Sequence, residues 1–240
     1  MNIESAQDMS VEQSHPKGKV EKLIVDRIYR AVMEQRLSPN TKLSESKLCE
    51  TFGVGRMHVR RALLLLSSEG LIDLQSNRGA YVASPNQKDA NDVFEARLII
   101  EPSLVRNLVG NINHEALDDL SKHITLENKA REKNQRTDLI RLSGEFHVKL
   151  ALASGNPIIA KTVRELVTKT SLIVGLFGSA PHFACPDDEH LKILTAIKNK
   201  HPAEAEQLLI THLNHIWQGL NVTGYASSQN DLADILGGSL

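Results

Sequence analysis

The spacing of apolar residues divides the chain into a short N-terminal set of helices and strands and a longer remainder that is helical throughout. In the first part, helical spacing and boundary residues predict three helices, at about 20–35, 45–52 and 56–69. Two strand-like pieces follow, "LIDLQ" and "GAYVAS", joined by the turn sequence "SNR". Helix, helix-turn-helix and hairpin, in that order, predict a winged helix-turn-helix domain over 19–84.

The remainder, 88–222, consists of helical segments separated by breaks that contain Gly, Asn or Pro. The predicted helices span about 88–109, 114–134, 138–153, 157–178, 187–199 and 202–220. Pro102 should bend or restart the first of them. Residues 1–18 and 223–240 lack this periodicity, so we expect a disordered arm and a frayed tail. The predicted fold class is mainly α, with residues 84–86 linking the two domains.

Charge is distributed unevenly between these two domains. Residues 17–84 carry 12 Lys and Arg against 7 Asp and Glu, a net charge of +5, whereas residues 85–222 carry 16 against 17. A basic first third on a nearly neutral remainder indicates that the first third meets a polyanion. A solvated basic face is the alternative interpretation of the same bias.

Several classes of protein are excluded by simple features. The longest apolar runs, "ALLLL" at 62–66 and "LIVGLF" at 172–177, are too short to span a bilayer. The N-terminus lacks the apolar segment of a secretory signal. Cys49 and Cys185 match no metal or redox spacing, which is typical of reduced cytosolic thiols. We therefore expect a cytoplasmic protein with no membrane partner.

The N-terminal end of the third helix concentrates basic groups, with no acidic residue before Glu69. A recognition helix places its N-terminal residues on base edges in the major groove, where Arg donates to guanine. The preceding helix crosses the backbone, and the hairpin tip is suited to reach a phosphate or the minor groove. An ordinary basic helix end is the alternative. The residues predicted to contact double-stranded DNA are Lys47, Arg56, His58, Arg60, Arg61, Arg78 and Gly79.

"KLSESKLCETFGVGRMHVRRALLLLSSEGLI", followed by "SNRGAYVAS", resembles the winged helix of the GntR family of transcriptional regulators. The resemblance implies that Arg56, Arg60, Arg78 and Gly79 occupy DNA-contacting positions. Asn40, Gly55, Met57, His58 and Arg61 depart from the family pattern. His58 and Arg61 lie where contacts vary, so they should alter which operator is read rather than whether DNA is bound.

Three histidines in the helical domain, His147, His190 and His212, share faces with apolar residues on three different helices. For each one alone, a packed core histidine is the simpler interpretation. Three together favour a site for a divalent transition metal, because helix bundles build such sites from facing helices and neutral imidazoles suit Zn, Ni or Fe. Arg97 also falls on an apolar stripe. Its guanidinium must meet either an internal carboxylate or a bound anion.

The segments "FEARLIIEP", "FHVKLALASGNP", "DDEHLKILTAI" and "LLITHL" resemble the FCD ligand-sensing domain of the FadR-type GntR branch, an antiparallel helical bundle. The resemblance implies a metal held by one Asp and three histidines, here His147, His190 and His212. Ser143 stands where the Asp is expected. Arg97 matches an arginine that helps to hold a carboxylate ligand. Zn is the expected metal, with Ni, Mn or Fe as alternatives, and an anionic metabolite should contact Arg97 and Ser143.

These expectations combine into a homodimeric, metabolite-responsive transcriptional regulator, a repressor rather than an activator. A dimer would read a palindromic operator with two recognition helices one turn of DNA apart. Two alternatives stay open. A three-histidine site with an open position also outlines a metal-dependent hydrolase, and a purely structural metal would likewise use three histidines.

Overall fold

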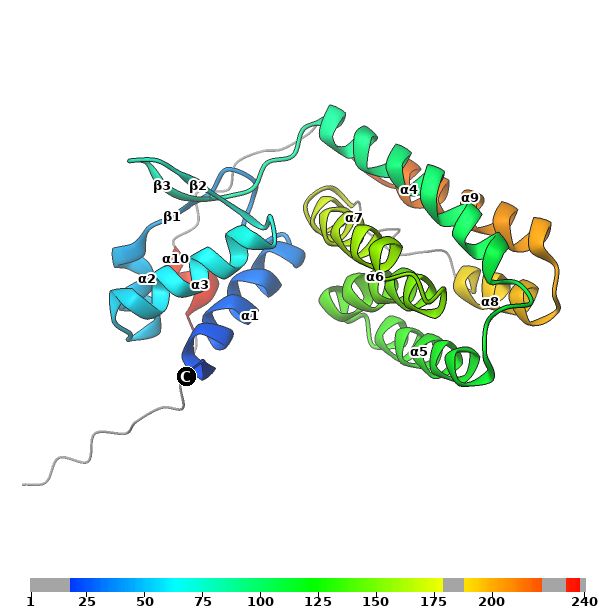
Figure 1. The fold of residues 1–240 in the computed structure, drawn as a ribbon. Coiled ribbons are helices and arrows are strands. Elements are labelled where there is room, and N and C mark those ends of the chain that lie inside the picture. The colour runs from blue at the N-terminus through cyan, green and yellow to red at the C-terminus, as the bar shows by residue number, and fades with distance from the viewer. Residues whose placement is uncertain (1–17, 179–187, 222–231, 238–240) are drawn as a thin grey trace, which may run out of the picture.

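The computed structural model describes residues 18–178, 188–221 and 232–237, so the predicted arm at 1–17 lies outside the described residues. The winged helix-turn-helix is present as predicted, with α1 (Lys19–Met33), α2 (Glu45–Phe52) and α3 (Arg56–Ser68). Strands β2 (Ile72–Gln75) and β3 (Gly79–Val82) form the hairpin. A two-residue strand that was not predicted, β1 (Lys42–Leu43), pairs antiparallel with β3, which gives the sheet order β1-β3-β2. Figure 1 shows this sheet beside the three helices.

Within the described residues, six helices build the second domain, close to their predicted bounds. They are α4 (Gln87–Leu108), α5 (His114–Glu132), α6 (Arg136–Ala153), α7 (Pro157–Phe177), α8 (Glu189–Lys198) and α9 (Pro202–Gln218). Asparagine caps explain where three of them begin, because Asn86, Asn113 and Asn156 each accept a hydrogen bond from a backbone amide of the first turn. Of the two effects predicted for Pro102, a bend or a restart of the helix, the restart is wrong, since α4 continues through Pro102 as one helix.

The bundle packs α6 between α5 and α7, and α9 along α4 and α8 (Figure 1). Most of its core is an apolar cluster that includes Phe146, Val163 and Leu209. A second cluster fills the winged-helix domain and continues into the C-terminal half of α7, through Leu172 and Leu176. The two domains therefore share a packed boundary.

That boundary is held by polar contacts at the C-terminal ends of α1 and α7. The guanidinium of Arg136 donates through Nε to the Met33 carbonyl at 2.7 Å and through Nη2 to the Gly175 carbonyl at 3.2 Å. A Cβ added at Gly175 would lie 2.5 Å from the sulfur of Met33, so any larger residue at 175 would require the Met33 side chain to move.

Within the described part of the predicted tail, 232–237, the chain is helical rather than frayed, and 223–231 and 238–240 lie outside the described residues. Helix α10 (Leu232–Leu236) packs against α1 and α2. Leu232 and Leu236 are buried there, and Arg27 of α1 donates to the Leu236 carbonyl at 3.1 Å. The weak periodicity of five residues among glycines and serines explains why the pattern did not predict this helix.

Candidate functional site

Three helices bring His147, His190 and His212 together in the bundle core. His147 lies on α6, His190 on α8 and His212 on α9, and all three residues are buried, with exposed fractions of 1%, 3% and 0%. Nε2 of His212 lies 3.0 Å from Nε2 of His147 and 3.2 Å from Nε2 of His190. The structure thus joins three residues that the sequence placed only on inward faces.

The opposite nitrogen of each ring meets a carboxylate. The Nδ1 atoms of His147, His190 and His212 lie 2.6, 2.7 and 2.8 Å from carboxylate oxygens of Glu101, Glu127 and Glu189. These acids come from α4, α5 and α8. A metal-binding histidine almost always donates its second ring N–H to such a partner, which fixes the tautomer and ring orientation.

The three carboxylates are ionised. Although burial opposes ionisation of Glu101, Arg97 and His147 lower the pKa of its carboxyl well below the ordinary value. Burial likewise opposes ionisation of Glu127, yet the pKa of that carboxyl is lowered by its interaction with His190 and by the positive charge of Arg131. The pKa of the Glu189 carboxyl is also lowered, against burial, by hydrogen bonds.

An ionised carboxylate only accepts hydrogen bonds, so each Nδ1 must carry its ring proton. In a neutral imidazole Nε2 is then a bare acceptor. Burial is the largest influence on His147 and lowers the pKa of its imidazole well below the ordinary value, which keeps that ring neutral. Where all three rings are neutral, facing acceptors cannot bond to one another, and a cation between them would satisfy all three.

The donor set fits a transition metal. Imidazole nitrogens about 2.0–2.1 Å from a zinc ion, at bond angles of about 90–109°, lie roughly 2.9–3.4 Å apart. The Nε2 atoms of His147 and His190 lie 3.0 and 3.2 Å from that of His212, within this range. Within the described residues, these three histidines are the group whose ligand atoms converge in this way.

The sequence left two possible partners for the buried guanidinium of Arg97, on α4: an internal carboxylate or a bound anion. In the structure the partner is an internal carboxylate. Arg97 Nε lies 2.6 Å from Oε1 of Glu101, one helical turn away, and both side chains are 2% exposed. The same Glu101 carboxylate therefore links Arg97 to His147.

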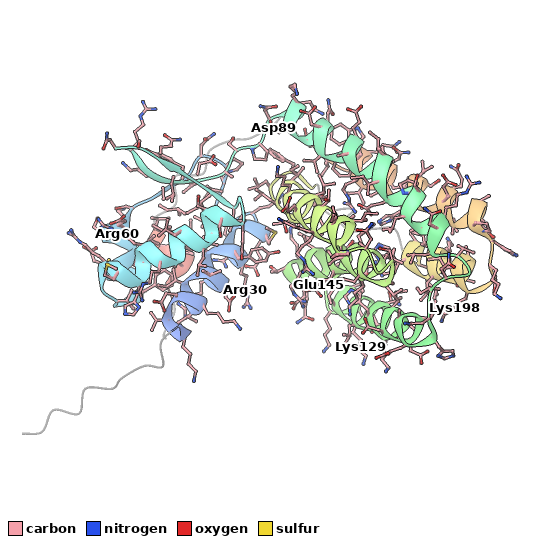
Figure 2. The ribbon with its side chains drawn as sticks, viewed as in Figure 1. Arg30, Arg60, Asp89, Lys129, Glu145 and Lys198 are labelled. Carbon is pink, nitrogen blue, oxygen red and sulfur yellow. The ribbon has the colours of Figure 1, made fainter. Side chains whose placement is uncertain are left out.

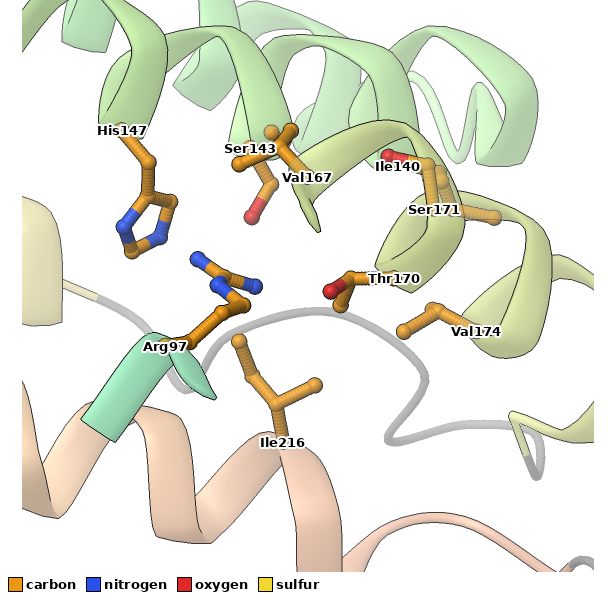
Figure 3. A pocket seen from close by; sticks show the side chains of 10 residues that line it. Arg97, Ile140, Ser143, His147, Val167, Thr170, Ser171, Val174 and Ile216 are labelled. Atoms are coloured by element: carbon orange, nitrogen blue, oxygen red, sulfur yellow. The ribbon is translucent and has the colours of Figure 1, made fainter. Parts of the chain in front are cut away.

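Arg97 also lines a cavity with Ser143 and His147, as Figure 3 shows. The wall opposite Arg97 is formed by hydroxyl-bearing residues of α7, Thr170 and Ser171. The cavity volume of about 30 Å³ has room for about two water molecules. A metabolite of several carbon atoms would require the walls of this cavity to move.

The predicted DNA-contacting residues all lie in the winged-helix domain, and Figure 2 shows Arg60 on the side away from the bundle. Lys47, Arg56, Arg60, Arg61, Arg78 and Gly79 are exposed, and His58 is half-exposed. Two acids contact them. Arg60 Nε lies 2.9 Å from a carboxylate oxygen of Glu45, and His58 Nδ1 lies 3.1 Å from Oε1 of Glu21.

Sequence reasoning missed the three acids behind the histidines and the burial of His123. A signal existed for two of the acids, because Glu101 follows Arg97 by one turn on the apolar stripe, and Glu127 continues the row of Leu120 and Ile124. No sequence signal marked Glu189 as a partner of a histidine, since an acid in the first turn of a helix is common. His123 is buried, with Nε2 2.8 Å from the Leu142 carbonyl.

Two family models match the chain. The model described as bacterial regulatory proteins, gntR family, covers residues 21–82, and the FCD domain model covers residues 92–215, more than half of the chain. The protein belongs to the GntR family. Within the described residues, no helix of this GntR-family protein is long and apolar enough to cross a membrane.

Relatives of this GntR-family protein are transcriptional regulators. It is 30% identical to the HTH-type transcriptional repressor NanR of Klebsiella aerogenes, over 74% of this chain and 76% of NanR. It is 26% identical to the repressor RspR of Escherichia coli K12, over 87% of this chain and 92% of RspR. The predicted DNA-binding regulator is confirmed, and the hydrolase alternative is not supported.

Solved structures share the fold. Escherichia coli McbR/YncC aligns with a TM-score of 0.64 at 18% identity, covering 83% of this chain and 97% of McbR/YncC. A GntR transcriptional regulator from Rhodococcus sp. RHA1 aligns with a TM-score of 0.65 at 20% identity, covering 81% of this chain and 93% of the Rhodococcus chain. At this level of sequence identity the solved structures support the fold alone, which is a winged helix followed by an antiparallel helical bundle.

Proposed function

We propose that this GntR-family regulator holds one divalent transition metal ion on His147, His190 and His212. The observation that carries the proposal is the convergence of three Nε2 atoms whose Nδ1 partners are all carboxylates. Zn suits three imidazoles, and Ni, Mn or Fe are alternatives. When bound, the ion supplies a Lewis-acidic positive charge that attracts an anion.

The charge of the site favours an anionic effector. Three carboxylates surround the histidines, and two of them contact arginines, Glu101 with Arg97 and Glu127 with Arg131. With the histidines neutral, the net charge of the three carboxylates and the two guanidinium groups is −1. A divalent ion would raise this net charge to +1. Ser143 contributes no charge where the resembled family has an Asp. A small monocarboxylate would restore neutrality, with Ser143 donating a hydrogen bond and Arg97 contributing positive charge.

The signal from this site would pass to the winged helix through α6 and α7. Ser143 lies on α6, and Arg136 at the start of the same helix donates to the C-terminal carbonyl of α1 at Met33. An effector weakens DNA binding only as far as it prefers the non-binding arrangement of the domains. Relatives named as repressors support repression.

We further propose that the regulator acts in the cytoplasm as a homodimer on a palindromic operator. Two copies place two recognition helices one turn of DNA apart. The contact residues are Lys47, Arg56, His58, Arg60, Arg61, Arg78 and Gly79, whose exposure on one domain supports this assignment.

A thermal-shift screen of small monocarboxylates, with and without zinc, tests the effector part. A ligand raises the melting temperature by mass action, and the rise should require zinc. Arg97→Ala removes the positive charge that this residue contributes to the effector site, so it should abolish the rise. A melting temperature that zinc raises and no carboxylate changes would instead indicate a purely structural metal.

A further inference from the structure

Glu21, at the start of α1, lies beneath the exposed face of the recognition helix. Its Oε1 is 3.1 Å from His58 Nδ1 and 3.5 Å from Arg61 Nη1. The side chain of Glu21 is 8% exposed, whereas those of His58 and Arg61 are 45% and 62% exposed. One buried carboxylate therefore contacts two side chains of the proposed DNA-contacting face.

The contact is not explained by stability alone. Oε2 of Glu21 is buried with no hydrogen-bond partner among the described residues, and leaving a buried acceptor unpaired destabilises the fold. A backbone hydrogen bond, followed by His58, lowers the pKa of the Glu21 carboxyl, which keeps it ionised. A charged group that stays buried despite this loss of stability is expected to have a role in the DNA-contacting surface above it.

The carboxylate dictates the hydrogen bonding of His58. Because an ionised carboxylate only accepts, His58 Nδ1 must donate to it, and in the neutral form of the ring Nε2 is then left as an acceptor. No partner of His58 Nε2 is found within the part of the chain that the structure describes. In the major groove an acceptor pairs with the amino group of cytosine N4 or adenine N6.

The same carboxylate restrains Arg61. An Arg on this helix without a carboxylate beside it would add one phosphate contact. Phosphate contacts carry no sequence information, so this contact would strengthen binding to any duplex. With Glu21 beside it, Arg61 must share its charge between the protein carboxylate and a phosphate, which reduces that gain.

We propose that Glu21 is a specificity-determining residue of DNA recognition, which presents His58 as an acceptor for a base amino group and limits the phosphate binding of Arg61. This rests on the proposed DNA-contacting face. Glu21 touches no DNA itself in this account and acts by positioning His58 and Arg61.

The test uses the full chain and duplexes selected by it from a random library. Dissociation constants for a selected and an unrelated duplex are measured by fluorescence anisotropy at several salt concentrations. In Glu21→Gln the salt slope of log Kobs should steepen by about 0.9, which at 0.1 M salt corresponds to up to about eight-fold tighter binding of the unrelated duplex. Repeated selection should show relaxed preference at one base pair.

Two controls separate this effect from charge in general. Asp26→Asn removes the same charge from an exposed position of α1 and should leave the ratio of the two dissociation constants unchanged. His58→Ala should relax the same base pair, and adding Glu21→Gln to it should relax nothing further. Equal effects of Glu21→Gln and Asp26→Asn, or further relaxation in the double variant, would overturn the inference.

Arg56→Ala distinguishes failure of the inference from failure of the proposed face. Weaker binding by Arg56→Ala supports the face, and unchanged binding shows that the face is wrong. If Arg56→Ala weakens binding while Glu21→Gln behaves like Asp26→Asn, the role of Glu21 alone is refuted.

Discussion

Glu101→Gln should both destabilise the bundle and weaken metal binding, because one carboxylate serves Arg97 and His147 at once. Its oxygens lie 2.6 Å from Arg97 Nε and 2.6 Å from His147 Nδ1, and all three side chains are at most 2% exposed. Gln offers one carbonyl oxygen in place of two charged oxygens, so Arg97 keeps a buried charge with no counter-charge from residue 101.

The expected magnitudes follow from this burial. Removing one partner of a buried ion pair costs about 3–5 kcal/mol of unfolding free energy. If the Gln carbonyl faces Arg97, its amide donates to His147 Nδ1, and the ring proton moves to Nε2, the atom proposed to bind the ion. Loss of such an outer partner typically weakens metal affinity by about 10–100-fold.

Urea unfolding of the metal-stripped protein measures the first effect, and competition for zinc with a chelating dye measures the second. Glu145→Gln on α6 is the matched control, because Glu145 pairs with Arg141 at 2.8 Å with both side chains more than 40% exposed. An exposed pair contributes about 0–1 kcal/mol. Equal unfolding free energies and zinc affinities for the two variants would refute the role assigned to Glu101.

Three further predictions concern other parts of the molecule. Ser143→Asp should tighten zinc binding and abolish any zinc-dependent stabilisation by carboxylates, measured by dye competition and thermal shift; unchanged values would contradict a shared site. Arg136→Ala removes charged hydrogen bonds to carbonyls at the domain boundary and should cost about 1.5–3 kcal/mol in urea unfolding, whereas a cost below that of Arg141→Ala would refute it. Burial raises the pKa of Tyr29 to about 12, so between pH 10 and 12 the unfolded state loses this proton while the folded state keeps it. Stability should fall by about 1.4 kcal/mol per pH unit there, and Tyr29→Phe should lack this component; identical pH slopes would contradict it.

The pattern of apolar residues predicted the helices well because each buries one face at regular spacing, as in α9, where Leu209 and His212 lie on the same inward stripe. It also placed the three histidines on such faces. It could not show that their Nε2 atoms meet, because that depends on how α6, α8 and α9 pack.

What the sequence could not predict depends on contacts between distant residues. Glu127 lies 63 positions from His190, and Glu21 lies 37 positions from His58, so no local spacing connects them. Strand β1 has two residues, too short for an alternating pattern, and is defined by its pairing with β3. Helix α10 depends on the surface of α1 and α2 for its burial.

The central claim is that His147, His190 and His212 together hold one divalent ion, and metal stoichiometry tests it most directly. The chain is stripped with a chelator, dialysed, and titrated with zinc under native mass spectrometry. We predict one zinc ion per chain for the wild type and for His201→Ala, an exposed histidine paired with Glu204, and loss of that ion in His212→Ala. No bound zinc in the wild type, or equal binding by His212→Ala, would contradict the claim.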